Sequence, residues 1–199
     1  MAAAWSRLHH GIDPRGNRLL WWWLRAMWLA GRPLAAIRTP PLLVTVAGVA
    51  AAVSAAVVGT PWVGLVLVLA SVVCDGIDGA VAVLRARASR TGALADKIAD
   101  RLADIAIIAV LWRLGAPIVL VIVAIAAALG VEVVREVVGG SALRTITVGE
   151  RPSRVMCVVI GCVCAGVSSA TWPLTVCASV LVALSVFAVG QLRAAGRAS

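Results

Sequence analysis

Long runs of apolar residues dominate the chain, and short polar links separate them. After residue 38, six such runs each approach the roughly 20 residues that a helix needs to cross a bilayer. The expected transmembrane helices are Pro41–Thr60, Pro61–Leu84, Gly92–Leu114, Ala116–Val138, Pro152–Thr171 and Trp172–Leu192. The links at 85–91 and 139–151 are longer and basic, whereas the other three are tight turns. The pattern predicts an all-α membrane protein with six transmembrane helices.

The N-terminal region has a different pattern, in which arginines and tryptophans alternate with apolar residues. Tryptophan rings beside arginine side chains are typical of the membrane–water interface. We expect an interfacial amphipathic helix from Arg18 to Ala30, ended by Gly31 and Pro33. A disordered basic tail is the alternative for this region.

Composition agrees with the membrane class. Hydrophobic residues make up 62% of the 199 residues, charged residues only 14%, and the mean hydropathy is +1.02. Soluble domains carry about a quarter charged residues, so a soluble protein is excluded. We expect a cytoplasmic and interfacial segment, residues 1–38, followed by one six-helix domain, residues 39–199.

The basic residues are distributed unevenly across the predicted topology. All but Arg113 of the 18 Lys and Arg residues fall on one side, which the positive-inside rule identifies as cytoplasmic. Trp62, Trp112 and Trp172 fall at the opposite boundary, where an outer aromatic belt belongs. The net charge of +9 therefore indicates contact with anionic lipid headgroups rather than with nucleic acid. We expect a multi-pass protein of the cytoplasmic membrane with both termini and the acidic residues inside.

Five of the six aspartates gather near the cytoplasmic ends of the second and third predicted helices. They are Asp75, Asp78, Asp96, Asp100 and Asp104. Spacings of three and four residues place each set on one helical face, and a short link makes the two helices antiparallel neighbours. Converging carboxylates repel one another, and Mg²⁺ or Mn²⁺ bound by oxygen ligands relieves that repulsion. Such ions also bind substrate phosphates, and a pair of them can clamp both oxygens of a displacement.

Two other interpretations of these acids stay open. Neighbouring cations could simply neutralise them, namely Arg85, Arg87, Arg90, Lys97 and Arg101. Alternatively, the acids could relay protons or bind a cation in a small transporter. The phasing of five acids at one membrane edge favours the metal site over both.

The same residues resemble the signature of the CDP-alcohol phosphotransferases, D-x2-D-G-x2-A-R-x8-G-x3-D-x3-D. Here the pattern reads Asp75-x2-Asp78-Gly79-x2-Ala82 and then Gly92-x3-Asp96-x3-Asp100. The resemblance implies a homodimeric, divalent-metal-dependent membrane enzyme of phospholipid biosynthesis with six transmembrane helices. It would transfer a phosphatidyl group from a CDP-linked lipid such as CDP-diacylglycerol to an alcohol, releasing CMP.

The resemblance also implies residue roles. Two Mg²⁺ or Mn²⁺ ions would be held by Asp75, Asp78, Asp96 and Asp100. Asp100 would in addition be the general base for the acceptor hydroxyl. The nucleotide would be bound by Asp78, Gly79, Ala82 and Gly92.

One signature position departs from the pattern, because Val83 stands in place of the arginine. Arg87 lies one helical turn further on the same face, and we expect it to supply the missing cation to the nucleotide. If it does not, the chain is a catalytically degenerate member that binds nucleotide or lipid.

The acceptor alcohol is indicated by a second group of residues. The segments 96–104 and 149–154 resemble actinobacterial phosphatidylinositol-phosphate synthases, which implies inositol phosphate as acceptor. Arginine suits multidentate contact with phosphate, so the acceptor's phosphate would be bound by Arg135, Arg144, Arg151 and Arg154. The segment 134–144 is also similar to phosphatidylglycerophosphate synthases, so glycerol phosphate is an alternative acceptor. Ordinary positive-inside charge is the remaining explanation for these arginines.

Overall fold

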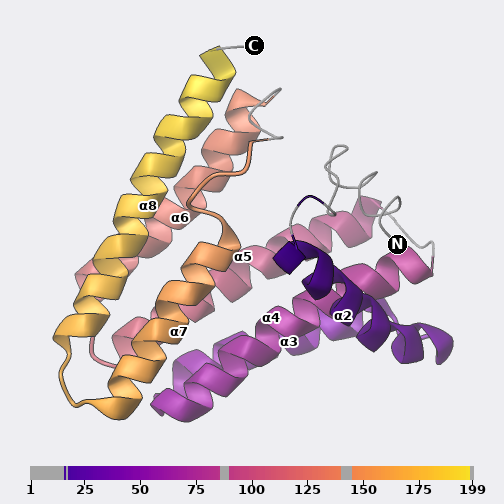
Figure 1. Ribbon diagram of the computed structural model, residues 1–199, viewed down its shortest axis with the longest axis horizontal. Helices are drawn as coiled ribbons and strands as arrows, with labels where there is room; N and C mark the ends of the chain where they lie inside the picture. The colour runs from indigo at the N-terminus through magenta and orange to yellow at the C-terminus, as the bar shows by residue number, and fades with distance from the viewer. Residues whose placement is uncertain (1–15, 17, 86–89, 140–144, 198–199) are drawn as a thin grey trace. The chain divides into compact units, whose positions relative to one another are not determined.

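The computed structural model of the chain describes residue 16 and residues 18–85, 90–139 and 145–197. These ranges are helical almost throughout and contain no strand. The helices, in chain order, are α2 (Arg18–Ala36), α3 (Pro41–Val58), α4 (Pro61–Leu84), α5 (Arg90–Arg113), α6 (Ile118–Val138), α7 (Arg151–Val167) and α8 (Trp172–Arg197) (Figure 1). The prediction of an all-helical protein is confirmed.

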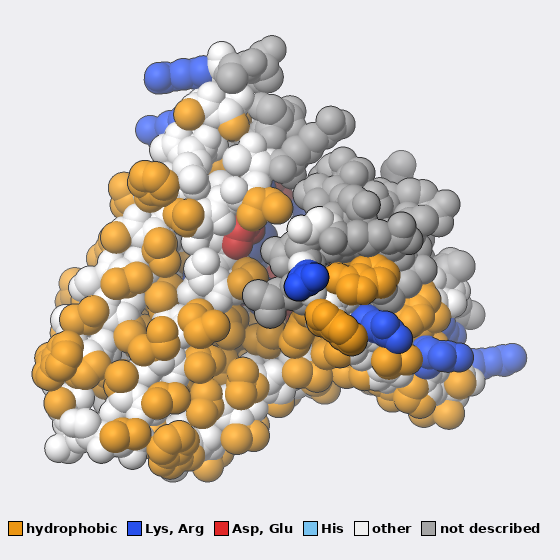
Figure 2. Space-filling model, viewed as in Figure 1, with side chains coloured by type: hydrophobic (Ala, Val, Ile, Leu, Met, Phe, Trp, Pro, Cys, Tyr) orange, Lys and Arg blue, Asp and Glu red, His pale blue; other side chains and the backbone are white. Residues whose placement is uncertain are grey.

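Four of these helices are long and apolar enough to cross a membrane, namely α3, α4, α6 and α8. The third and fifth expected spans correspond in position to α5 and α7. Helix α5 carries charged residues along its first half, and α7 has only 17 residues. Figure 2 shows apolar side chains over the visible faces of α7 and α8, as a lipid-facing surface requires. The protein is a membrane protein, and six crossings remain a prediction.

Helix α2 continues through the two residues that the sequence predicts as its end, so that boundary is wrong. Gly31 and Pro33 both lie inside the helix, which ends at Ala36. A Cβ at Gly31 would lie 3.2 Å from the Cβ of Ala80 in α4, so this glycine permits close helix packing. Packing against α4 thus outweighs the low helix propensity of glycine and proline. The chain leaves the helix at Arg38, whose φ of 61° lies in the left-handed region. The interfacial position of α2 stays a prediction.

The fifth expected helix is also shorter than the sequence predicts. Helix α7 ends at Val167, four residues before Thr171, because Ser168 has an extended backbone with φ −138° and ψ 144°. The amide of Ser168 still donates to the carbonyl of Cys164 at 2.9 Å, which completes the last turn.

The described residues divide into two compact units. The first holds the described residues of Met1–Ala50 and of Leu69–Asp100, and the second holds the described residues of Ala51–Val68 and of Arg101–Ser199.

In the first unit, glycines allow α2 and α3 to approach α4 closely. A Cβ at Gly76 of α4 would lie 2.7 Å from Cγ of the buried Met27 in α2. A Cβ at Gly48 of α3 would lie 3.0 Å from the Cβ of Cys74. The part of α4 that carries Asp75 and Asp78 is therefore packed between two other helices.

In the second unit, α8 packs along both α6 and α7 (Figure 1). Val131 of α6 and Ala188 and Leu192 of α8 are fully buried and form a shared apolar cluster. Helices α5 and α7 also approach closely, because a Cβ at Gly161 would lie 2.5 Å from Leu111. This packing fixes the positions of charged residues on α5, α6 and α7.

Candidate functional site

Asp78 is the most buried of the signature aspartates, with 5% of its surface exposed. Its Oδ2 accepts a hydrogen bond of 2.6 Å from the hydroxyl of Thr45, which lies on α3. A buried carboxylate is costly unless it is hydrogen-bonded, so Thr45 stabilises Asp78 and orients it. Asp75, three residues earlier on α4, is partly buried and has interactions of its own.

Two aspartates of α5, Asp96 and Asp100, belong to the first unit together with Asp75 and Asp78 of α4. The charges of Asp96 and Asp100 both act on the carboxylate of Asp78 and repel it. Asp96 is exposed and Asp100 is half-buried, and each has other interactions. Asp96 and Asp100 therefore act electrostatically on Asp78, and the expectation that the four acids form one site stays a prediction.

The donor set suits a hard cation, because carboxylate oxygens are the ligands that Mg²⁺ and Mn²⁺ prefer. Such a cation would relieve the repulsion that Asp96 and Asp100 exert on the carboxylate of Asp78. Among the residues that the structure describes, no three Asp, Glu, His or Cys side chains are grouped closely enough to hold an ion. The ligand set of Asp75, Asp78, Asp96 and Asp100 therefore stays a prediction.

The small residues of the signature differ in what surrounds them. A Cβ at Gly79 would meet nothing within 4 Å, so helix packing does not require a glycine there. Gly92 is exposed and Ala82 is half-buried. Arg87 lies outside the described residues. The open space beside Gly79 is compatible with a bound ligand, and the nucleotide roles stay predictions.

Arg85 is the described cation nearest in sequence to Val83, and it contacts the backbone. Its Nη1 donates to the carbonyls of Arg38 at 2.9 Å and Thr39 at 2.8 Å. The side chain therefore ties the end of α4 to the junction between α2 and α3. Val83 itself is half-buried in α4.

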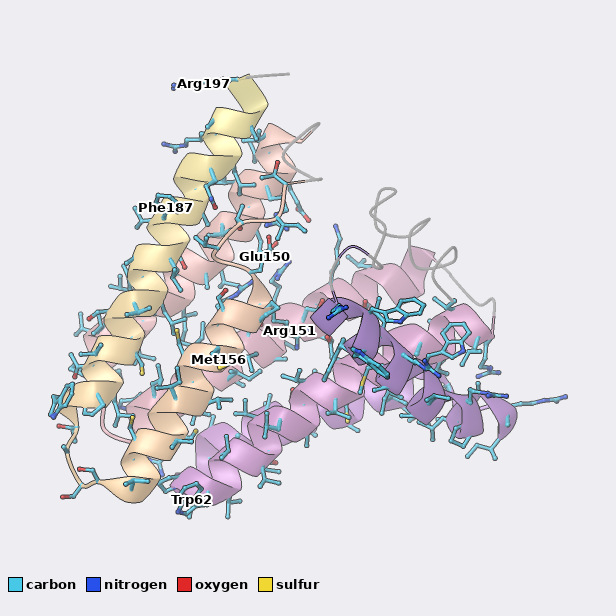
Figure 3. All side chains as sticks on the ribbon, in the orientation of Figure 1. Trp62, Glu150, Arg151, Met156, Phe187 and Arg197 are labelled. Atoms are coloured by element: carbon cyan, nitrogen blue, oxygen red, sulfur yellow. The ribbon has the colours of Figure 1, made fainter. Side chains whose placement is uncertain are left out.

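The expected acceptor arginines lie in the second unit, apart from Arg144, which is outside the described residues. Arg135 of α6 forms an ion pair with Glu150, and Glu150 also accepts the backbone N–H of Thr147 at 3.1 Å. Burial raises the pKa of the Glu150 carboxyl, but the hydrogen bonds from Arg135 and Thr147 outweigh it and leave the pKa below its usual value. Figure 3 shows Glu150 and Arg151 together at the start of α7.

Arg154 is buried and is held by acids from two other helices. Its Nη1 lies 2.9 Å from Oδ2 of Asp104 on α5, and its Nη2 lies 2.9 Å from Oε1 of Glu132 on α6. Arg151 approaches Asp104 with its Nε at 3.5 Å. The structure therefore brings Arg151 and Arg154 together around Asp104.

Sequence reasoning gives no role to Thr45 or Glu132, although both contact candidate residues. Each had a recognisable feature, because each is a polar residue inside an otherwise apolar run. An acid within a predicted span, such as Glu132, is a functional candidate by default. Thr45 has only a hydroxyl, and its partner on α4 is visible only in the folded chain.

Comparison with known proteins gives concordant results. Residues 38–190 match the CDP-alcohol phosphatidyltransferase family. A phosphatidylinositol phosphate synthase of Mycobacteroides abscessus is 32% identical over 172 residues, which cover 80% of this chain and 78% of that protein.

Two crystal structures of the phosphatidylinositol phosphate synthase of Mycobacterium tuberculosis share the fold at 24% identity. The structure with CDP-DAG bound has a TM-score of 0.67, and the match covers 86% of this chain and 94% of the M. tuberculosis chain. The structure in complex with manganese and citrate has a TM-score of 0.65, with 85% and 88% covered. The register of the signature aspartates, the helical fold and the family match over 38–190 agree, and the chain belongs to the CDP-alcohol phosphatidyltransferase family of transferases.

Proposed function

We propose that this protein transfers the phosphatidyl group of CDP-diacylglycerol to an inositol phosphate and releases CMP. The observation that carries the proposal is the register of the signature aspartates on α4 and α5. Among them Asp78 is buried and accepts a hydrogen bond from Thr45. The negative charges of Asp96 and Asp100 repel its carboxylate. The relative from Mycobacteroides abscessus supports an inositol phosphate as the acceptor.

In this proposal the chain's residues bind the donor and move one proton. Asp75, Asp78, Asp96 and Asp100 would hold two Mg²⁺ or Mn²⁺ ions, which supply positive charge to the diphosphate oxygens. Asp100 accepts the proton of the acceptor hydroxyl. The hydroxyl oxygen then bonds to the phosphorus that carries the lipid, while the bond from that phosphorus to CMP breaks. The open space beside Gly79 leaves room for the nucleotide.

The proposed setting is the cytoplasmic membrane, with six crossings and both chain termini on the cytoplasmic side. The distribution of the basic residues supports this orientation, because only Arg113 lies opposite. The proposed oligomer is a homodimer, as the family resemblance implies.

The test is CMP release by the purified protein in lipid nanodiscs with CDP-diacylglycerol and Mn²⁺ or Mg²⁺. We expect release with inositol phosphate to exceed release with glycerol 3-phosphate, serine or unphosphorylated inositol. Asp100→Asn should lower the rate by at least about 100-fold, since it removes the general base. If folded protein releases no CMP with any acceptor, the proposal is wrong. If release is fastest with glycerol 3-phosphate, then glycerol 3-phosphate is the acceptor instead of inositol phosphate.

A second candidate function is that of a family member that binds the donor without turnover. The observation that favours it is Val83, together with the engagement of Arg85 by backbone carbonyls. Val83→Arg separates the two candidates. Turnover that appears only in this variant would support the non-catalytic member, whereas comparable turnover in both proteins would support the enzyme.

A further inference from the structure

Three turns between helices lie at one end of the second unit, and close contacts connect them to their neighbours. A Cβ at Gly115, whose φ of 119° lies in the left-handed region, would lie 2.9 Å from Cγ2 of Thr171. The turn between α5 and α6 therefore packs on the turn between α7 and α8. A Cβ at Gly166 of α7 would lie 2.6 Å from Cε2 of Trp62, which Figure 3 shows at the start of α4.

Arg113, the last residue of α5, reaches the third turn, which joins α3 to α4. Its Nη2 donates to the carbonyl of Val57 at 3.4 Å. A Cβ at Gly59, which has a φ of 64°, would lie 3.2 Å from the same nitrogen. The Cζ of Arg113 also lies 5.7 Å from the centroid of the Trp112 ring, a distance typical of a cation–π contact. The guanidinium group is therefore held over the turn, although the side chain is exposed.

Arg113 has no carboxylate partner within the part of the chain that the structure describes. Asp104, the nearest acid in sequence, lies more than two helical turns earlier in α5. A guanidinium group has five N–H donors, and a single hydrogen bond to the described protein uses one of them. The positive charge and the remaining donors are therefore available to an anion from outside the chain.

The surface around Arg113 is aromatic and apolar. Trp62, Trp112 and Trp172, the expected outer aromatic belt, expose 51%, 45% and 68% of their surface. Val57, whose carbonyl binds Arg113, is itself 67% exposed. Tryptophan rings prefer the headgroup depth of a bilayer, and exposed apolar patches mark contacts with membranes. Arginine binds phosphate oxygens through paired N–H groups, so a phospholipid satisfies both the cation and the apolar surface.

We infer that Arg113, Trp112 and the turn between α3 and α4 bind the phosphodiester of an anionic phospholipid in the outer leaflet. The phosphodiester pairs with the charge of Arg113, while the acyl chains contact the exposed apolar side chains. A zwitterionic lipid binds less well, because its choline group brings a second positive charge near Arg113. This lipid site requires the proposed orientation of the chain but not the transfer reaction.

The test is photo-crosslinking in nanodiscs of phosphatidylcholine with a small fraction of phosphatidylglycerol that carries a diazirine in its headgroup. Mass spectrometry of peptic peptides should locate the label on residues 57–62 and 112–113 of the wild-type protein. Arg113→Gln should lower this label about tenfold, the loss expected for one charged hydrogen bond. Arg113→Lys should retain part of the label, because it keeps the charge but not the planar fork. Arg193→Gln, an exposed arginine on α8, is the matched control and should leave the label unchanged.

Competition in the wild-type protein provides a second measurement, which does not depend on the folding of a variant. Replacement of part of the phosphatidylcholine by unlabelled phosphatidylglycerol should reduce the label, because the two anionic lipids compete for Arg113. Inorganic phosphate in the buffer should not reduce it. The lipid site is wrong if the label is equal in wild-type protein and folded Arg113→Gln, or if unlabelled phosphatidylglycerol leaves it unchanged. A reduction by inorganic phosphate as large as that by the lipid would identify a site for free anions instead.

Discussion

The hydroxyl of Thr45 on α3 lies 2.6 Å from Oδ2 of Asp78 on α4. The same hydroxyl is 3.2 Å from the carbonyl of Pro41, one turn earlier in its own helix. A hydroxyl has one hydrogen to donate, and the shorter contact to a charged acceptor is the stronger hydrogen bond. The hydroxyl of Thr45 therefore donates its hydrogen to Asp78 on α4 rather than to the carbonyl of Pro41 in its own helix.

Replacement of Thr45 by valine keeps the shape of the side chain and removes this donor. We expect Thr45→Val to weaken the proposed metal site, because Asp78 loses the group that orients its carboxylate. The concentration of Mn²⁺ needed for half-maximal CMP release should rise about tenfold, as expected when a hydrogen bond to a charged group is lost. Thr45→Ser should retain most of the affinity. Ser54→Ala, on the exposed side of the same helix, should have no effect, and equal metal affinity in all variants would refute the role of Thr45.

Gly76 and Gly79 lie one turn apart on α4, and we expect opposite consequences from the same substitution. Gly76→Ala places a methyl group 2.7 Å from Cγ of Met27, whereas the methyl group of Gly79→Ala meets nothing within 4 Å. The gain in helix propensity is the same in both variants. A difference between their free energies of unfolding therefore measures the cost of overpacking at Gly76. Gly76→Ala should be less stable than Gly79→Ala by about 1–3 kcal/mol in chemical unfolding in detergent.

Gly79→Ala should impair the binding of CDP-diacylglycerol, whereas Gly76→Ala should not. If the nucleotide occupies the space beside Gly79, Gly79→Ala should raise the KM for CDP-diacylglycerol without loss of stability. Gly76→Ala should leave that KM unchanged in the protein that remains folded. A normal KM in Gly79→Ala would remove Gly79 from the nucleotide site.

The stability contributed by Glu150 should depend on pH. Its pKa is lowered in the folded protein, because the hydrogen bonds from Arg135 and Thr147 outweigh the effect of burial. The contribution is therefore fully present above the usual value of 4.5 and is lost as the pH falls through the lowered pKa. Wild-type protein should melt at a higher temperature than Glu150→Gln at pH 7, and the difference should shrink below about pH 4.5. A difference that stays constant between pH 7 and pH 3 would show that the charge of Glu150 contributes nothing.

Arg85 should hold the junction between α2 and α3 in place. Arg85→Gln removes two hydrogen bonds to the carbonyls of Arg38 and Thr39, and a hydrogen bond from a charged donor stabilises more than one between neutral groups. Trypsin should then cleave after the exposed Arg38 faster than in the wild-type protein. Arg193→Gln is the control for a general effect of charge loss. Equal cleavage rates in both variants would mean that Arg85 does not restrain the junction.

The sequence alone determined the helical membrane class, the approximate positions of the helices and the register of the signature aspartates. These features are local, because apolar run length, helical spacing and charge along the chain are sufficient to predict them. The expected C-terminal ends of α2 and α7 differ from those in the structure, where the helices end at Ala36 and Val167. At Gly31 the helix continues where α4 approaches it closely at Ala80, and no neighbouring residue in the chain indicates that approach.

The tertiary structure decided which side chains meet. Thr45 and Asp78 are joined only because α3 packs against α4, and Arg154 is held only because α5 and α6 bring Asp104 and Glu132 to it. The sequence shows each of these residues as a polar position in an apolar helix but does not name its partner. Partner choice depends on which helix faces pack together, and that is a property of the folded chain rather than of any one segment.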